Sequence, residues 1–170
     1  GKVTFNKAVF LNAGDSQDVR FAADEFPQLR FENPRVWWPH PLGKQELYVL
    51  KLAVDTKGRL SDSVSTTFGI RKITSVINEE GWRLFYVNGH KTLIRGGAWM
   101  TSDMLLRLSK KRYDALIRYA REANLNMLRS EGFSIRETED FFTLCDQYGI
   151  MVTQQIFGRS IPDEALAIAC

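Results

Sequence analysis

Apolar and polar residues alternate in short stretches over the first 70 residues of the chain. Val3 and Phe5 stand between polar neighbours, and every second residue from 48 to 54 is aliphatic or aromatic. This period of two is typical of half-buried β-strands. Lys57-Gly58 predicts a turn into another strand at 64–68. Prolines at positions 27, 34, 39 and 41 exclude any helix in this region. The pattern predicts a β-sandwich that lacks its first strands.

The pattern changes after Ile70. Trp82–Val87 and Lys91–Arg95 flank Asn88-Gly89, a dipeptide typical of tight β-hairpins. A helix is then predicted from about Ser109 to Ala123, because its apolar residues fall on one stripe: Tyr113, Leu116, Ile117 and Ala120. Asn124 is a plausible stop for this helix.

A second predicted helix lies between two short strands. The first of these strands is Leu125–Arg129, and the second begins at Ile150 and continues to about Ile156. Ser134 and Glu137 have the spacing of a capping box, which would start the helix. The helix would run to Tyr148, where Gly149 ends it.

The strands and helices of this second region alternate. An apolar strand at Leu93 leads into Gly96-Gly97, and about ten residues precede the first helix. The order β-α-β-α-β predicts a parallel sheet with right-handed crossovers. No phosphate-binding glycine loop is present, and the long loop before the helix favours a barrel over a nucleotide crevice.

The predicted fold class is therefore multidomain β plus α/β. A partial β-sandwich would cover residues 1–70, and the first βα units of an incomplete barrel would cover residues 71–170. The boundary is expected within Ser65–Lys72. Because the chain starts at Gly1 and ends at Cys170 in the middle of a pattern, we expect it to be part of a longer protein.

Composition narrows the classes of partner. Hydrophobic residues make up 44% of the chain and charged residues 25%, as in ordinary globular proteins. The net charge of +3 is small, and the one basic run, Lys110–Arg112, opens a helix without a stacking pattern of aromatics. We therefore expect no nucleic-acid partner. No apolar run is long enough to span a bilayer, so no membrane partner is expected either.

The thiols and imidazoles predict neither a disulfide framework nor a metal site. Cys145 falls on the apolar side of a predicted helix, where a buried free thiol is common. His40 and His90 stand alone in predicted turns, with no second ligand at a suitable spacing. No metal or cofactor is expected. The cellular compartment and the oligomeric state stay open.

Charged residues follow the ends of the predicted parallel strands. Asp103 lies in the first βα loop, and Arg129 and Glu131 close the second strand on one face. Neighbouring strands lie about 4.8 Å apart, so these side chains should converge. An Arg between two carboxylates can bind hydroxyls, and two carboxylates attract a cation such as an amine. The alternative is a structural ion pair. Use of the two acids as a catalytic pair is disfavoured, because nothing sets one apart from the other.

Three tryptophans allow two roles each. Trp99 is a candidate platform for the apolar face of a sugar or a packing residue, and the sequence does not separate the two. Trp37-Trp38 offers the same choice, and packing within a small sandwich is favoured there.

Five short motifs in a fixed order cover nearly the whole chain. They are Val36-Trp-Trp-Pro with Leu47-Tyr48, Phe68–Arg71, Phe85–Gly89, Ile94–Gly97 and Asn126–Arg129. Together they resemble glycoside hydrolase family 2, in which an immunoglobulin-like sandwich precedes a (β/α)₈ TIM barrel. The resemblance implies a truncated immunoglobulin-like sandwich at 1–70 and the N-terminal part of a glycosidase catalytic domain at 71–170.

Within that family, two motifs resemble one branch. The pattern from Gly96 through Trp99 and Asp103 to Arg107 is similar to β-mannosidases, mannosylglycoprotein endo-β-mannosidases and exo-β-D-glucosaminidases. The ending Arg129-Ser-Glu131-Gly132 looks most like the glucosaminidases, in which the acids matching Asp103 and Glu131 receive the substrate amine. The resemblance thus implies a carbohydrate partner, with Asp103, Arg129, Glu131 and Trp99 as substrate-binding residues.

The chain also departs from the family pattern. Val152-Thr-Gln-Gln155 stands where the family often has an aromatic residue and an acid, which leaves the roles of Gln154 and Gln155 open, and the tail 161–170 matches nothing. A retaining glycosidase needs two carboxyl groups about 5–5.5 Å apart. In the family these are glutamates on later strands, so the nucleophile and the acid/base are expected beyond Cys170 and none is assigned here. The alternatives are a β-mannosidase or endo-β-mannosidase fragment, or a non-catalytic carbohydrate-binding or scaffold module.

Overall fold

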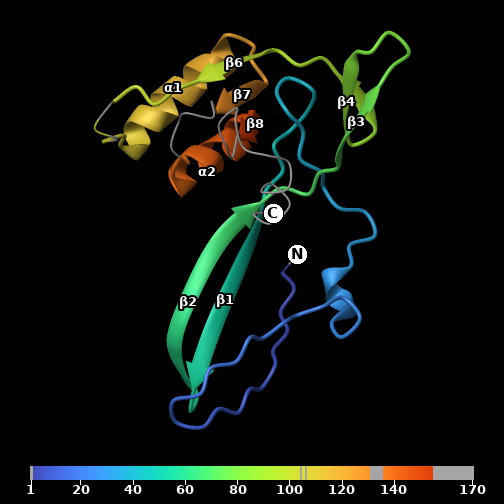
Figure 1. Ribbon diagram of the computed structural model, residues 1–170. Coiled ribbons are helices and arrows are strands. Elements are labelled where there is room, and N and C mark those ends of the chain that lie inside the picture. Colours follow the sequence, from blue (N-terminus) through green and yellow to red (C-terminus); the bar gives the residue numbers. More distant parts are fainter. Residues whose placement is uncertain (1, 104, 106, 131–135, 155–170) are drawn as a thin grey trace, which may run out of the picture. The chain divides into compact units, whose positions relative to one another are not determined.

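The computed structural model describes residues 2–103, 105, 107–130 and 136–154. The chain divides into two compact units, Gly1–Pro34 and Arg35–Cys170. The second unit holds three separate sheets (Figure 1).

The first unit has little regular structure. Its one element within residues 2–34 is the 3₁₀ helix η1, Pro27–Leu29. Three rings, Phe5, Phe21 and Phe26, pack with centroids 4.9–5.5 Å apart. Two predictions are therefore wrong here. The Val3–Phe5 alternation forms no strand, since alternation alone supplies no hydrogen-bonding partner. Pro27 does not exclude a helical turn, because it occupies the first helical position, where its missing N–H costs nothing.

A long hairpin follows in the second unit. Strand β1 (Tyr48–Thr56) pairs with β2 (Arg59–Phe68) in an antiparallel ladder. Lys57 and Gly58 both have positive φ, at 51° and 74°, which is the backbone of a two-residue turn that matches the strand twist. The predicted turn and both predicted strands are confirmed.

A three-stranded antiparallel sheet comes next. It consists of β3 (Ile73–Ile77), β4 (Arg83–Val87) and β5 (His90–Thr92), in that order. The Asn88-Gly89 turn joins β4 to β5 with φ values of 50° and 81°, as the dipeptide predicts. The pattern gave no sign of β3, which pairs with β4 along its full length.

The third sheet is parallel, as predicted. Strands β6 (Gly96–Trp99), β7 (Met127–Ser130) and β8 (Met151–Gln154) lie in sequence order. Helix α1 (Lys110–Glu122) connects β6 to β7, and α2 (Glu139–Tyr148) connects β7 to β8 (Figure 1). The two glycines lie inside β6 and do not follow a strand. A Cβ on Gly96 would stand 2.7 Å from the Met127 carbonyl oxygen, so only glycine fits the approach to β7.

The ends of the two helices can be compared with their predicted limits. Ser109 caps α1 by accepting a hydrogen bond from the Arg112 amide at 3.3 Å, and Asn124, with φ of 60°, follows its end. Gly149, with φ of 78°, ends α2 as predicted. The Ser134–Glu137 capping box is wrong. Thr138 is the N-cap of α2, and Ser134 lies outside the described residues. The Glu137 carboxylate binds other side chains, described below.

Both helices pack against one face of the parallel sheet. The buried cluster there joins β6, β7, α1, α2 and the residue before β8, and consists of Trp99, Tyr113, Ile117, Leu128, Phe141, Leu144, Cys145 and Ile150. A smaller cluster of Trp37, Val87 and Met151, with Met127 packed against it, lies on the opposite face. The predicted apolar stripe of α1 is confirmed by this packing.

Candidate functional site

The two faces of the parallel sheet separate the candidate site residues. Successive side chains of a strand point to opposite faces. Leu128 belongs to the cluster under the helices, and Met127 packs on the other side. Arg129 therefore shares the face of Met127, and it is exposed. Trp99 packs with Leu128. The structure thus places Trp99 and Arg129 on opposite faces of the sheet.

On the face away from the helices, one row of residues crosses the sheet. Ala98 of β6, Arg129 of β7 and Thr153 of β8 are register partners. The side chain of Ala98, the β6 partner of Arg129, is small and so occupies little space on this face of the sheet. The Thr153 hydroxyl donates to the Met127 sulfur at 3.4 Å. Glu131, which the sequence predicts beside Arg129, lies outside the described residues.

Asp103 lies in the loop between β6 and α1, on the side of the sheet where the parallel strands end. Its carboxylate accepts hydrogen bonds from the Leu105 amide at 3.0 Å and from the Arg107 amide at 3.3 Å. The Arg107 Nε forms an ion pair with it at 3.3 Å. The Asp103 side chain stays 28% exposed. A carboxylate has about four acceptor sites, so these bonds brace the loop and leave capacity for a ligand.

Trp99 lies behind the sheet with Glu137. Its indole N–H donates to Glu137 Oε1 at 2.8 Å, and its ring packs 4.8 Å from the Phe141 ring. Only 7% of Trp99 is exposed. These contacts are those of packing, one of the two roles that the sequence left open. Contact between Trp99 and a sugar stays a prediction.

Glu137 is the centre of a buried polar cluster. Its Oε1 also accepts from the Thr101 hydroxyl at 3.1 Å, and its Oε2 accepts from the Tyr113 hydroxyl. Burial, and then the bond to Glu137, raise the pKa of Tyr113 to about 12, so the phenol keeps its proton. Sequence reasoning missed this cluster and read Glu137 as a local helix cap. No short-range signal marks it, because its donors stand 24 to 38 residues earlier.

A second polar junction joins the Trp37 segment to α2. Trp37 is fully buried, and its indole N–H donates to the Asp146 carbonyl at 2.7 Å. The Arg71 guanidinium lies 4.5 Å from the centre of the Trp37 ring and pairs with the Asp146 carboxylate at 3.0 Å. Burial raises the pKa of Asp146, and Arg71 partly offsets that rise. Trp37 thus has a packing role, as predicted, but it packs against Val87, Met151 and α2 and not within a sandwich.

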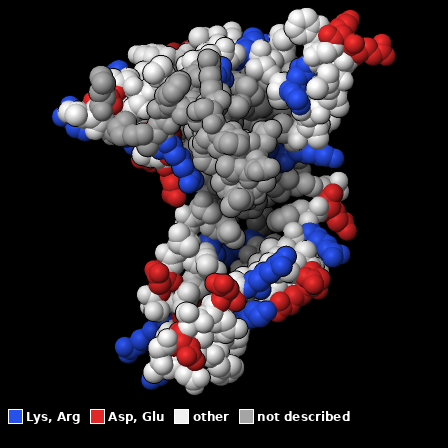
Figure 2. All heavy atoms as spheres, viewed as in Figure 1, with Lys and Arg blue, Asp and Glu red and all other residues white. Residues whose placement is uncertain are grey.

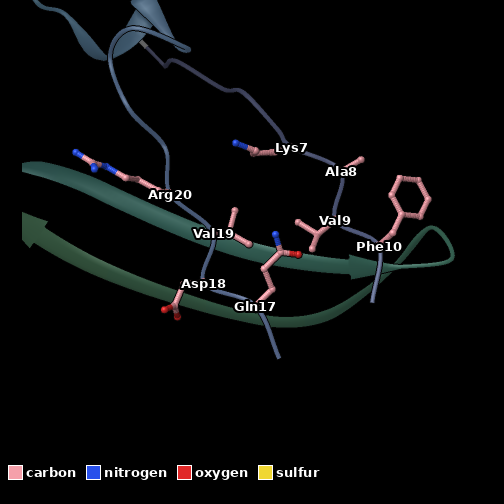
Figure 3. A pocket seen from close by; sticks show the side chains of 8 residues that line it. All are labelled: Lys7, Ala8, Val9, Phe10, Gln17, Asp18, Val19 and Arg20. Carbon is pink, nitrogen blue, oxygen red and sulfur yellow. The ribbon is translucent and has the colours of Figure 1, made fainter. Parts of the chain in front are cut away.

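Hollows in the surface of the described residues lie in both units of the chain. One, of about 310 Å³, lies in the first unit between residues 7–10 and 17–20 (Figure 3). Phe10 points away from it and is 93% exposed, and no pair of acids converges there. The other, of about 170 Å³, lies on the Arg129 face of the parallel sheet and is lined by Arg71, Met127, Met151 and Thr153 among others. None of Trp99, Asp103 and Arg129 lines either of these hollows.

The described residues do not support a metal site or a cysteine nucleophile. They contain no group of three or more His, Cys, Asp or Glu side chains that could hold a metal. In the same part of the chain, no helix has both the length and the apolar character to cross a membrane. Cys145 is buried, and burial raises the pKa of its thiol, so it is no nucleophile at neutral pH. Figure 2 shows Lys and Arg interspersed with Asp and Glu on the face in view.

Comparisons with known proteins point to one enzyme family. The family model of glycosyl hydrolases family 2 matches residues 2–71. A mannosylglycoprotein endo-β-mannosidase of Lilium longiflorum is 43% identical over 160 residues, which is 85% of this chain and 17% of the relative. An exo-β-D-glucosaminidase of Streptomyces avermitilis is 38% identical over 151 residues, 89% of this chain and 16% of the relative.

A solved structure agrees with these relatives. A β-D-mannosidase from Dictyoglomus thermophilum aligns with a TM-score of 0.66 and 38% identity, over 72% of this chain and 16% of that one. The chain thus spans about a sixth of the length of the relatives it matches. The family model matches the first part of the chain, and glycosidase relatives match most of it. This chain therefore belongs to glycosyl hydrolases family 2.

Proposed function

We propose that this chain is part of a retaining β-glycosidase that removes terminal β-linked glucosamine. Asp103, Arg129 and Glu131 line the pocket for that sugar, and Trp99, at the end of β6, supports it from the helix side of the sheet. The observation that carries this proposal is the parallel register of β6, β7 and β8, with Arg129 exposed on the face away from the helices. In (β/α)₈ enzymes, sites form at the carboxyl ends of the strands.

The architecture we propose for the intact protein extends what this chain contains. Residues 71–170 are the start of a TIM barrel, with α1 and α2 on its outside. Residues 1–70 are the end of an immunoglobulin-like sandwich, to which the β1–β2 hairpin contributes. The relatives are about six times as long, so the remaining strands belong to the rest of the protein. The nucleophile and the acid/base lie there, beyond Cys170.

The proposed pocket suits an amine. An ammonium group between two carboxylates forms charge-assisted hydrogen bonds, which are roughly twice as strong as neutral ones. A sugar without the amine would leave the two acids facing each other without a cation. The names of relatives support this substrate class, since exo-β-D-glucosaminidases recur among them.

The test uses the intact protein with p-nitrophenyl β-D-glucosaminide and p-nitrophenyl β-D-mannoside. Glu131→Gln removes the charge at constant shape. Loss of a charged hydrogen-bond partner costs about 1.5–3 kcal/mol, so kcat/KM on the glucosaminide should fall roughly 10- to 150-fold. The mannoside, which has no amine, should lose much less. Glu139→Gln on the exposed start of α2 is the matched control.

A β-mannoside is the second candidate substrate. It is favoured by the 43% identity to the lily endo-β-mannosidase, above the 38% to the Streptomyces glucosaminidase. Asp103 would then bind a ring hydroxyl. Two results for Glu131→Gln would contradict an amine-binding pocket. One is an equal loss of kcat/KM on both substrates, and the other is glucosaminide turnover within about threefold of the unchanged protein. Sugar binding without any turnover would instead favour a non-catalytic module.

A further inference from the structure

We propose that Glu137 is a positioning residue for the sugar pocket: its carboxylate fixes the base of the loop 100–109 and so holds Asp103 in place. This inference rests on the proposed function, since it concerns the same pocket. Glu137 lies on the helix side of the sheet, so it acts through the loop and does not touch the sugar.

First, the three side chains that donate to Glu137 come from the two ends of the loop 100–109. Glu137 Oε1 accepts from Trp99 Nε1 at 2.8 Å and from Thr101 Oγ1 at 3.1 Å. These two residues flank Met100, where the chain leaves β6 and becomes the loop. The other oxygen accepts from Tyr113 on α1, the helix into which the same loop leads. One carboxylate thus binds the last residue of β6, the start of the loop and the helix that follows it.

The second step is the burial of this carboxylate. Glu137 is 8% exposed, and no Lys, Arg or His of the described residues lies within ion-pair distance of it. A buried carboxylate costs more than an apolar residue of the same size unless its hydrogen bonds are well made. Three side-chain donors meet that condition here. Loss of the Glu137 carboxylate would leave the Trp99, Thr101 and Tyr113 donors without their acceptor, so this one side chain fixes the positions of all three relative to one another.

The third step links this geometry to Asp103. Thr101 and Asp103 are two residues apart, a span of at most about 7 Å along the chain. Beyond Asp103, the loop is braced by the Asp103 carboxylate itself, which binds the Leu105 and Arg107 amides. Because Asp103 is tethered this closely to Thr101, we infer that Asp103 shifts when Thr101 loses its bond to Glu137. In enzymes, a misplacement of about 1 Å can reduce activity about a hundredfold.

The experiment compares three variants of the intact enzyme. Glu137→Ala removes the acceptor. Glu137→Gln keeps one oxygen for Trp99 and Thr101, and its amide can donate to the Tyr113 hydroxyl. Glu139→Ala, on the exposed first turn of α2, is the matched control. KM and kcat are measured on p-nitrophenyl β-D-glucosaminide and β-D-mannoside, and hydrogen exchange is measured across residues 100–109.

For Glu137→Ala we expect KM to rise about tenfold or more with kcat within about threefold, because the loop contributes to binding rather than to the reacting groups. Exchange across 100–109 should accelerate. Glu137→Gln should return both readings to within about threefold of the unchanged enzyme, and Glu139→Ala should leave them unaltered. An unchanged KM and unchanged loop exchange in Glu137→Ala would overturn the proposal, as would a fall in kcat alone.

Two complications have their own tests: a Glu137→Ala variant that does not fold, and an unchanged enzyme that cleaves neither substrate. If Glu137→Ala does not fold, Thr101→Val removes only the loop hydroxyl at nearly constant shape. Faster exchange across 100–109 and a KM raised about threefold or more would then support the proposal, and wild-type values for both would refute it. If the unchanged enzyme cleaves neither substrate, the proposed function fails by itself. Loop exchange in the Glu137 variants still decides whether this carboxylate holds the loop.

Discussion

The approach of β6 to β7 allows a sharp test, because two adjacent glycines differ in the space around them. A Cβ added to Gly96 would stand 2.7 Å from the Met127 carbonyl oxygen and 3.2 Å from the Met127 Cβ. A Cβ on Gly97 would meet nothing within 4 Å in the described structure. Neither glycine has a positive φ. Gly96→Ala and Gly97→Ala are therefore a matched pair that differ in contact alone.

The magnitude follows from two opposing effects. Gly→Ala reduces the freedom of the unfolded chain and so stabilises the folded state by about 0.4–1 kcal/mol in both variants. In Gly96→Ala the methyl group meets backbone, which has to shift, and overpacking of this kind costs about 1–3 kcal/mol. The difference between the two variants should therefore be about 1–3 kcal/mol, with Gly96→Ala the less stable.

Hydrogen exchange of the intact protein measures this difference locally. Amides in β7, Met127–Ser130, should exchange roughly 5- to 150-fold faster in Gly96→Ala than in Gly97→Ala, since each 1.36 kcal/mol corresponds to about a factor of ten. Equal protection of β7 in the two variants, with equal free energies of unfolding, would refute the close approach of the strands.

The remaining predictions concern the two polar junctions. Tyr113→Phe should destabilise the fold by about 1–3 kcal/mol, because the buried Glu137 carboxylate loses a donor. The raised pKa of Tyr113, about 12 against 10 for a free phenol, means that stability contributed by this group is complete below pH 10 and is lost as pH rises toward 12. The melting temperature of the unchanged protein should thus fall more steeply between pH 10 and about pH 12 than that of Tyr113→Phe; parallel curves would contradict this. Arg71→Met should destabilise by about 1–3 kcal/mol at pH 7, since it leaves the Asp146 carboxylate partly buried without its cation. This loss should shrink as pH falls, because the raised pKa of Asp146 lets that side chain become neutral early, whereas an equal loss at pH 4 and pH 7 would be inconsistent with the ion pair. Asp146→Asn in the Arg71→Met background should recover stability, since the Trp37 indole binds the backbone carbonyl of residue 146 and not its side chain.

Local signals in the sequence predicted the elements that depend on nearby residues. Asn88-Gly89 and Lys57-Gly58 adopt positive φ because such residues tolerate it, so both hairpin turns follow from residue type. The apolar stripe of α1 and the Asn124 stop both act within one or two helical turns. The alternation of strands and helices likewise predicted the parallel order of β6, β7 and β8.

The features that the sequence missed depend on partners far along the chain. Val3 and Phe5 alternate like a strand yet form none, while β3 was found only through its pairing with β4. A pattern states which face of a segment is apolar. It does not state which backbone will supply the hydrogen bonds.

The candidate site shows the same division. Sequence motifs were enough to predict that an acid, an arginine and another acid follow parallel strands, and to show which family these motifs resemble. The packed sheet and helices were needed to show that Trp99 and Arg129 point to opposite faces. They also showed that Glu137 binds Trp99, Thr101 and Tyr113 and does not cap its own helix. Turn and cap energies depend on a few neighbouring dihedral angles. A buried carboxylate is positioned by whichever donors the packed elements bring to it, and that choice exists only once the sheet and both helices have come together.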